Sequence, residues 1–234
     1  ITQDGQKEAM EHAGRTGGLP FVGVGWYRLN FEAPSFEKGK QATLIFDGAM
    51  SHARVYVNGK EAGYWPYGYN SFHLDVTPYL KAGEVNELAV RLENENESSR
   101  WYPGAGLYRN VHLVVTEDAY VPTWGTKVTT PVVKDKFAKV HLETQWNMPK
   151  GKKISDYTIA TEILNPESKK VNADTRPGDE LDITLFAQDF VVRNPSLWSV
   201  EYPHLDTAVS KIYEGDRLVD EYTTRFGIRT LEII

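Results

Sequence analysis

The sequence predicts an all-β protein built from two domains. Short segments alternate apolar and polar residues or combine β-branched with aromatic residues, and turn-forming pairs such as Asn58-Gly59 separate them. Aromatic residues reach 12% of the 234 residues, and few segments have helical periodicity. The length exceeds that of a common single domain. We therefore place one domain over residues 1–119 and a second over residues 120–234.

The first domain is expected to open with a polar, glycine-rich arm over residues 1–25 and to continue as strands. The pair Asn58-Gly59 is the strongest short hairpin signal and predicts a hairpin over residues 53–65. Residues 77–80 predict a short helical turn. The remaining strands of this domain are predicted at residues 26–31, 43–46, 72–76, 87–92 and 107–115.

The second domain repeats the β pattern after a boundary near residues 117–123. About seven short strands over such a length are typical of an immunoglobulin-like sandwich, although the absence of cysteine excludes an antibody-type disulfide. A turn at Asn194-Pro195 and the large ring of Trp198 are expected to anchor a loop between two strands. The strands of this domain are predicted at residues 127–130, 138–146, 158–164, 180–186, 205–213 and 218–226.

Composition excludes several classes of partner. The net charge is −6 and there is no Lys/Arg-rich block, so the chain lacks the basic patch of a nucleic-acid binder. No apolar run approaches the ~20 residues of a membrane-spanning helix, so no membrane partner is expected. The first residue is Ile, which predicts a processed or shortened chain. The absence of cysteine does not indicate a cellular compartment. A periplasmic or secreted bacterial location is favoured over the cytoplasm.

The sequence lacks the motifs of a self-sufficient catalytic or metal site. Its six histidines are dispersed without His-x-x-x-His spacing, and there is no Gly-x-Ser-x-Gly, P-loop or dinucleotide fingerprint. We therefore predict no catalytic residue, no metal site and no cofactor in this chain. His73 and His141 are expected to be hydrogen-bonded surface groups. Asp47 is expected to accept backbone hydrogen bonds in the Asp47-Gly48 turn.

Residues 100–111 form the most informative stretch, with three aromatic rings and two arginines around a Pro-Gly-x-Gly turn. Rings that stack on sugar C–H faces, beside guanidinium groups that donate to hydroxyls, suit carbohydrate. The simpler alternative is that Trp101, Tyr102 and Tyr108 only close one end of a β-sandwich.

A set of ordered motifs resembles the N-terminal region of glycoside hydrolase family 2. In the first half these motifs are Gly-Trp-Tyr-Arg at 25–28, Leu-Ile-Phe-Asp-Gly at 44–48, Val-Tyr-Val-Asn-Gly at 55–59, Gly-Tyr at 63–64, Leu-Ala-Val at 88–90 and the stretch 100–111. In the second half they are Asn-Pro-x-Leu-Trp-Ser at 194–199, Pro-x-Leu at 203–205 and Arg-Phe-Gly-Ile-Arg at 225–229. Within the family, the sequence of residues 101–109 is most similar to that of bacterial β-galactosidases.

The resemblance implies a jelly-roll, sugar-binding-type domain followed by an immunoglobulin-like domain. In the family both precede a TIM barrel, which is missing here and which holds the two catalytic glutamates at its strand ends. The implied parent is a retaining β-glycosidase that acts on a carbohydrate substrate, most similar to a β-galactosidase cleaving terminal β-D-galactose. A parent β-glucuronidase or β-mannosidase is the alternative. This segment alone is expected to be inactive.

The first domain in such enzymes lends loops to the rim of the active site, here residues 18–24 and 98–103. The resemblance thus implies four substrate-rim candidates, Val22, Arg100, Trp101 and Tyr102. Arg100 stands where the family has an acidic residue that reaches the sugar and a nearby cation. It is therefore expected either to bind substrate hydroxyls differently or to pair with a carboxylate of the barrel.

A different class of function is an autonomous carbohydrate-binding module. The jelly-roll half and the aromatics Trp65, Tyr67 and Tyr69, expected to be exposed, motivate it. Packing of these aromatics on the barrel or on another subunit is the favoured alternative, and a homo-oligomer is among the expected assemblies. The second domain, which has no clustered chemistry, is expected to act as a spacer.

Overall fold

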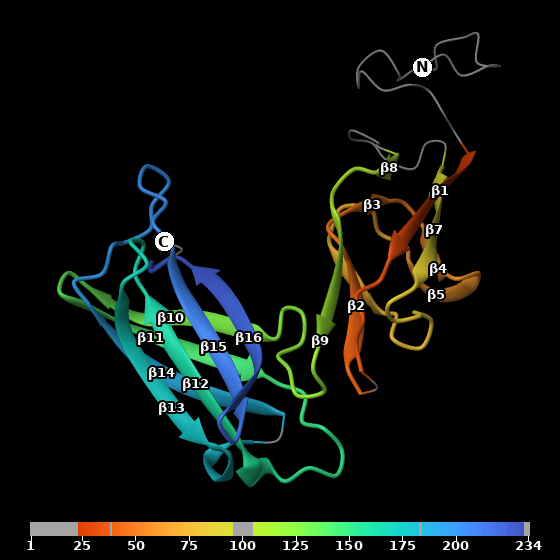
Figure 1. Ribbon diagram of the computed structural model, residues 1–234. Coiled ribbons are helices and arrows are strands. Elements are labelled where there is room, and N and C mark those ends of the chain that lie inside the picture. Colours follow the sequence, from red (N-terminus) through yellow and green to blue (C-terminus); the bar gives the residue numbers. More distant parts are fainter. Residues whose placement is uncertain (1–22, 38, 96–104, 183, 232–234) are drawn as a thin grey trace. The chain divides into compact units, whose positions relative to one another are not determined.

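The computed structural model describes residues 23–231 except 38, 96–104 and 183. Nearly all regular structure in these residues is β-strand, together with two short 3-10 helices (Figure 1). The chain divides into two compact units, residues 1–115 and 116–234. The boundary between residues 119 and 120 stays a prediction.

The first unit is a jelly-roll β-sandwich. One sheet has the strand order β1-β7-β4-β5, a second has β6-β2-β9, and a small third sheet pairs β3 with β8. Their bounds are β1 (Gly23–Glu32), β2 (Gln41–Phe46), β3 (Ala49–Met50), β4 (Ala53–Val57), β5 (Lys60–Trp65), β6 (Phe72–Asp75), β7 (Val85–Asn94), β8 (Gly106–Leu107) and β9 (Val111–Thr116).

The core of this unit lies between its two larger sheets. Alternate residues of β2, β4 and β7 point inward, and Phe46, Val55 and Val90 are at most 1% exposed. The period of two in these strands therefore produces the sandwich, because each strand can bury only one face. The predicted β4–β5 hairpin is confirmed, with positive φ at both Asn58 and Gly59.

The predicted strand over residues 107–115 is wrong in one respect, since the chain leaves the β geometry at residues 108–110 and forms two strands. Tyr108 lies in this interruption. Its hydroxyl donates to the Gly68 carbonyl at 2.7 Å and so ties the interruption to the loop at residues 66–71. β8 consequently pairs with β3, while β9 joins β2.

The second unit is an immunoglobulin-like sandwich of seven strands in a three-stranded sheet, β10-β11-β14, and a four-stranded sheet, β13-β12-β15-β16. Two 3-10 helices, η1 (Ile154–Asp156) and η2 (Gly178–Glu180), connect strands. The strand bounds are β10 (Thr126–Lys134), β11 (Phe137–Gln145), β12 (Tyr157–Leu164), β13 (Lys170–Pro177), β14 (Leu185–Arg193), β15 (Asp206–Glu214) and β16 (Arg217–Phe226).

One strand prediction is wrong in this unit, and one strand was missed. The strand expected at residues 180–186 begins only at Leu185 and continues to Arg193, and β13 was not predicted at all. β13 is a polar edge strand whose residues are mostly exposed, so it lacks the apolar alternation that reveals a strand. β14 has strict alternation of burial, but one of its inward positions is the polar Gln188.

A polar layer crosses the core of the second unit. Thr161 donates to Gln188 Oε1 at 2.7 Å and lies 3.1 Å from the hydroxyl of Ser210, and all three residues are at most 1% exposed. It lies between two separate apolar clusters, one around Trp146 and Tyr157 and the other around Phe190 and Phe226. The core is therefore two apolar halves with a hydrogen-bonded layer between them.

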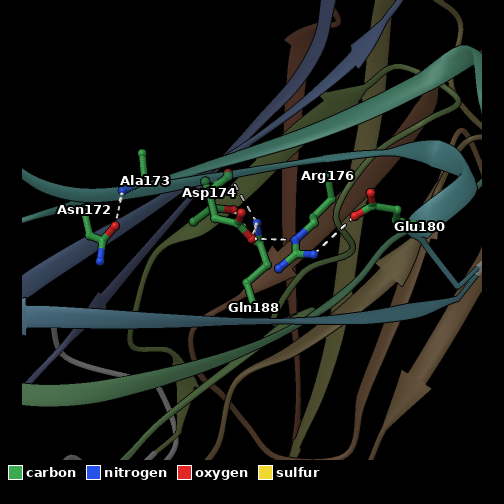
Figure 2. A network of polar contacts seen from close by, with 7 residues as sticks. Asn172, Ala173, Asp174, Arg176, Glu180 and Gln188 are labelled. Carbon is green, nitrogen blue, oxygen red and sulfur yellow. Dashed lines mark hydrogen bonds and ion pairs between the residues drawn. The ribbon is translucent and has the colours of Figure 1, made fainter.

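The polar layer reaches the surface along the edge where β13 faces β14. Gln188 Nε2 lies 3.2 Å from Asp174 Oδ2, and the same carboxylate accepts from Arg176 Nε at 2.8 Å (Figure 2). Arg176 also pairs with Glu180 at 3.2 Å, and these two carboxylates raise its pKa. Side chains thus close this edge of the sandwich.

Candidate functional site

The four predicted rim residues, Val22, Arg100, Trp101 and Tyr102, lie outside the described residues. The strands next to them are described. Val22 immediately precedes β1, and residues 100–102 belong to the connection between β7 and β8. The site is therefore built from these flanking positions.

The flanking positions meet at one end of the first sandwich, which we call the rim end and define by Gly23, Ser51, Asn94 and Gly106. Gly23 at the start of β1 is the Cα partner of Asn94 at the end of β7, because the two strands are antiparallel (Figure 1). Gly106 of β8 pairs with Met50, the residue before Ser51. Ser51 then exchanges backbone hydrogen bonds of 2.9 and 3.3 Å with Glu93, the neighbour of Asn94.

Two glycines permit close approach at the rim end. Gly106 has a φ of +104°, and a Cβ there would collide with the hydroxyl of Tyr27 on β1. A Cβ on Gly68 would collide with the side chain of Met50. β8 and the loop at residues 66–71 can lie against β1 and β3 only because these positions have no side chain.

His52 links the rim end to the neighbouring strands, although its backbone has the unfavourable φ of +49°. Its Nδ1 is 2.7 Å from the hydroxyl of Tyr64, and its Nε2 is 3.7 Å from Glu95 Oε1. Its backbone N–H donates to the Pro66 carbonyl at 3.1 Å. This residue was missed in the sequence, where no motif marks a lone histidine between two strands.

The charged side chains near His52 neutralise one another. Arg91 forms an ion pair with Glu93, and the hydrogen bond from its guanidinium lowers the pKa of the Glu93 carboxyl. Arg54 pairs with Glu61 at 3.0 Å and lies 4.9 Å from the ring centre of Tyr64. A carboxylate held in its ionised form by an arginine is a poor proton donor, so Glu93 is not suited to general acid catalysis.

The aromatic segment at residues 64–70 divides into a packed part and an exposed part. Trp65 stacks on Phe72 at 5.5 Å and donates to Asn70 at 3.1 Å, so its predicted exposure is wrong. Tyr67 and Tyr69 are 56% and 46% exposed, as predicted, with ring centres 5.6 Å apart. Tyr64 is also 42% exposed, but its ring is already in contact with Arg54, so the adjacent pair Tyr67 and Tyr69 is the better platform for a ligand.

Asp47 does not have its predicted role, because its carboxylate lies 3.1 Å from Nε2 of His112 on β9 and accepts no backbone hydrogen bond from the described residues. His141 is a hydrogen-bonded surface group as expected, 2.8 Å from Asp189. Within the described part of the chain, no group of three or more His, Cys, Asp or Glu side chains could hold a metal ion. No described helix is long and apolar enough to cross a membrane.

In the second unit the structure brings together two sequence motifs that lie about thirty residues apart, those at residues 194–199 and 225–229. The backbone N–H of Trp198 donates to the Ile228 carbonyl at 2.9 Å. The guanidinium of Arg229 lies 4.7 Å from the Trp198 ring centre. A Cβ on Gly227 would collide with Trp198, so the glycine admits the indole.

The described residues thus form a protein of two β-sandwiches, a jelly roll with a convergent loop end followed by an immunoglobulin-like sandwich. The model of the glycosyl hydrolases family 2 sugar binding domain matches residues 20–117, and the glycosyl hydrolases family 2 model matches residues 120–229. The chain belongs to glycosyl hydrolases family 2.

Individual relatives agree with this assignment. The β-galactosidase BoGH2A of Bacteroides ovatus is 40% identical over 96% of this chain and 27% of its own length. A putative β-glucuronidase of Formosa agariphila is 33% identical over 93% of this chain and 20% of its own. A solved family 2 member from Bacteroides cellulosilyticus has a TM-score of 0.81 at 34% identity and covers 88% of this chain and 27% of that one. The chain thus spans about a quarter of the length of the relatives that it matches.

Proposed function

We propose that this chain is the N-terminal, non-catalytic part of a retaining β-glycosidase, most similar to a β-galactosidase acting on terminal β-D-galactose. Its first unit supplies loops to the rim of the active site, and its second unit is a spacer. The catalytic barrel, the chain's main partner in this proposal, supplies both glutamates, so the segment alone is inactive. A periplasmic or secreted location and a homo-oligomeric parent belong to the same proposal.

The convergence of the rim end supports the proposal best. Two predicted rim segments, far apart in the sequence, adjoin strands whose ends are Cα partners, Gly23 and Asn94. The described strand ends that these segments adjoin are therefore neighbours in one sheet. The paired charges around His52 fix this end without offering a catalytic acid, which agrees with a positioning role.

The galactoside assignment has support from the β-galactosidase relative, whereas other relatives are named β-glucuronidases. Assays of the full-length parent on nitrophenyl β-galactoside, β-glucuronide and β-mannoside decide among these substrates. We expect turnover of the galactoside. Failure to cleave any nitrophenyl β-glycoside would refute the enzyme proposal.

The rim role is tested in the same parent with Arg100→Ala and Trp101→Ala. Because either change removes a contact to substrate, we expect kcat/KM to fall by at least about tenfold. Arg176→Ala in the second unit is the matched control and should leave kcat/KM unchanged. Equal kinetics of all three variants would exclude a rim role for residues 100 and 101.

The exposed pair Tyr67 and Tyr69 favours a second candidate function, an autonomous carbohydrate-binding module. Calorimetry of the isolated chain with galactosides and with plant or algal oligosaccharides separates the two. Binding with a dissociation constant near ~1 mM or below, lost in Tyr67→Ala, would support the module. We expect no such binding, because the barrel side of the pocket is absent.

A further inference from the structure

A groove of about 560 Å³ runs along the second unit between β10 and the segment that follows β16. It is the counterpart of the edge closed by Asp174 and Arg176, since β10 and β16 are edge strands of their respective sheets. The volume falls within the range of small-ligand sites, about 300–1,000 Å³. The groove lies wholly in the immunoglobulin-like unit.

Local backbone irregularity opens this edge. Near Thr126 the two sheets are joined by a 2.7 Å contact between the hydroxyls of Thr126 and Thr224. Farther along β10, the register against β11 shifts between Thr129 and Val132, around Pro131. Proline has no N–H to give to a ladder and is tolerated in such a bulge on an edge strand.

Two arginines line the groove, with no counter-charge among the wall residues that the structure describes. Arg225 and Arg229 both contribute to its wall, and no acidic residue does. Among the described residues, neither arginine forms a salt bridge. Arg109 and Arg193 also form none, whereas the other five described arginines do. In a chain of net charge −6, two unneutralised guanidinium groups in one groove favour an anionic ligand.

Arg229 is held in place before any ligand arrives. The Thr130 hydroxyl donates to its carbonyl at 2.7 Å, and the Trp198 ring lies 4.7 Å from its guanidinium carbon. Such preorganisation lowers the entropy lost on binding, because the donor does not have to be ordered by the ligand. A planar guanidinium suits a carboxylate or a sulfate, which it can bind through two parallel hydrogen bonds.

The rest of the wall suits a sugar ring. Val128, Leu205 and Leu231 provide aliphatic surface for C–H contacts, and Thr129 adds a hydroxyl. We propose that this groove is a second carbohydrate site that binds a sugar bearing an oxyanion, a uronate or a sulfate ester, with Arg225 and Arg229 as its clamp. The sugar part rests on the proposed function, and the anionic part rests on the two arginines alone.

The site is tested by measuring ligand binding to the 234-residue chain with NMR and calorimetry. This test has no catalytic readout, so its failure can be distinguished from a failure of the glycosidase proposal. The probes are D-glucuronate, D-galacturonate and galactose 6-sulfate, with neutral D-galactose and inorganic sulfate as references. We expect dissociation constants of about 1 mM for the anionic sugars, and these constants should rise as salt is added. The uronate and sulfate-ester arms show which oxyanion is preferred.

The variants Arg225→Gln and Arg229→Gln should each weaken binding at least about tenfold, as expected for loss of a hydrogen bond to a charged group. Arg193→Gln, at the exposed end of β14, is the matched control and should bind as the wild type does. Unchanged melting temperatures of all three variants exclude a folding effect. The proposal is overturned if galactose or inorganic sulfate binds as tightly as the anionic sugars, or if the groove variants bind like the control.

Discussion

Thr161 on β12 and Gln188 on β14 join the two sheets of the second unit through a buried hydrogen bond of 2.7 Å. Both residues are at most 1% exposed, and no water can replace either partner without entering the core. A polar pair in such a position is stabilising only while both partners are present, because an unpaired buried polar group costs more than the bond contributes.

Thr161→Val should therefore destabilise the second unit by about 1–3 kcal/mol, since it leaves Gln188 Oε1 without its donor. Urea unfolding of the single and double variants measures this. Thr161→Val with Gln188→Leu should cost clearly less than the sum of the two single changes, because both polar groups are then gone. Strict additivity would show that the pair is not coupled.

Asp206 predicts an unusual pH dependence. The residue is 1% exposed, and neither carboxylate oxygen has a hydrogen-bond partner among the described residues. Burial, with nearby Glu167, raises its pKa from 3.8 to about 6. The folded state then holds a proton that the unfolded state has released. Stability from this group is full below pH 3.8, declines as the pH rises toward 6 and is constant above.

The Asp206→Asn variant isolates this effect. Because the pKa of Asp206 rises from 3.8 to about 6, its ionisation in the folded state costs roughly 3 kcal/mol. The variant should therefore be more stable than the wild type by up to about 3 kcal/mol at pH 7.5 and similar to it at pH 4. Urea unfolding at both pH values measures the difference. A difference that does not change between the two would remove Asp206 as its source.

Asn58 predicts a local effect in the first unit. Its side-chain amide donates to Tyr79 O at 2.9 Å and to Asn86 Oδ1 at 2.7 Å, while its own Oδ1 accepts from Glu87 N–H at 3.1 Å. Asn58→Ala loses these bonds and places alanine at a φ of +51°. We therefore expect the free energy of unfolding to fall by about 2–4 kcal/mol in urea unfolding. Asn30→Ala, at an exposed position of β1, should change stability by less than about 0.5 kcal/mol.

Gly106→Ala predicts a change at the rim end. The new Cβ would collide with the Tyr27 hydroxyl and would sit at a φ of +104°, so β8 must move away from β1. We expect the free energy of unfolding to fall by about 1–3 kcal/mol and, in the parent enzyme, a lower kcat/KM. Gly59→Ala, at a positive φ in the β4–β5 turn with open space around it, is the control for backbone strain alone. Gly59→Ala should lower the free energy of unfolding without lowering kcat/KM. If both variants lower kcat/KM equally, Gly106 has no specific role at the rim end.

The sequence identified several segments of the candidate site but did not show which of them lie together in space. The motif at residues 25–28 was recognised, but its place beside residues 89–92 depends on the pairing of β1 with β7, which is a contact between distant parts of the chain. His52 and its links to Tyr64 and Glu95 carry no local pattern, since each partner comes from a different segment.

The sequence by itself determined the all-β class, the Asn58-Gly59 hairpin and the family, because side-chain alternation and turn chemistry are local properties. Only the tertiary structure decided how β13 and β14 run, which strand ends form the rim end, and that Arg225 and Arg229 share a groove. Gln188 shows the reason. A polar residue is acceptable in a core only when a partner such as Thr161 reaches it from the opposite sheet, and no stretch of sequence around it records that partner.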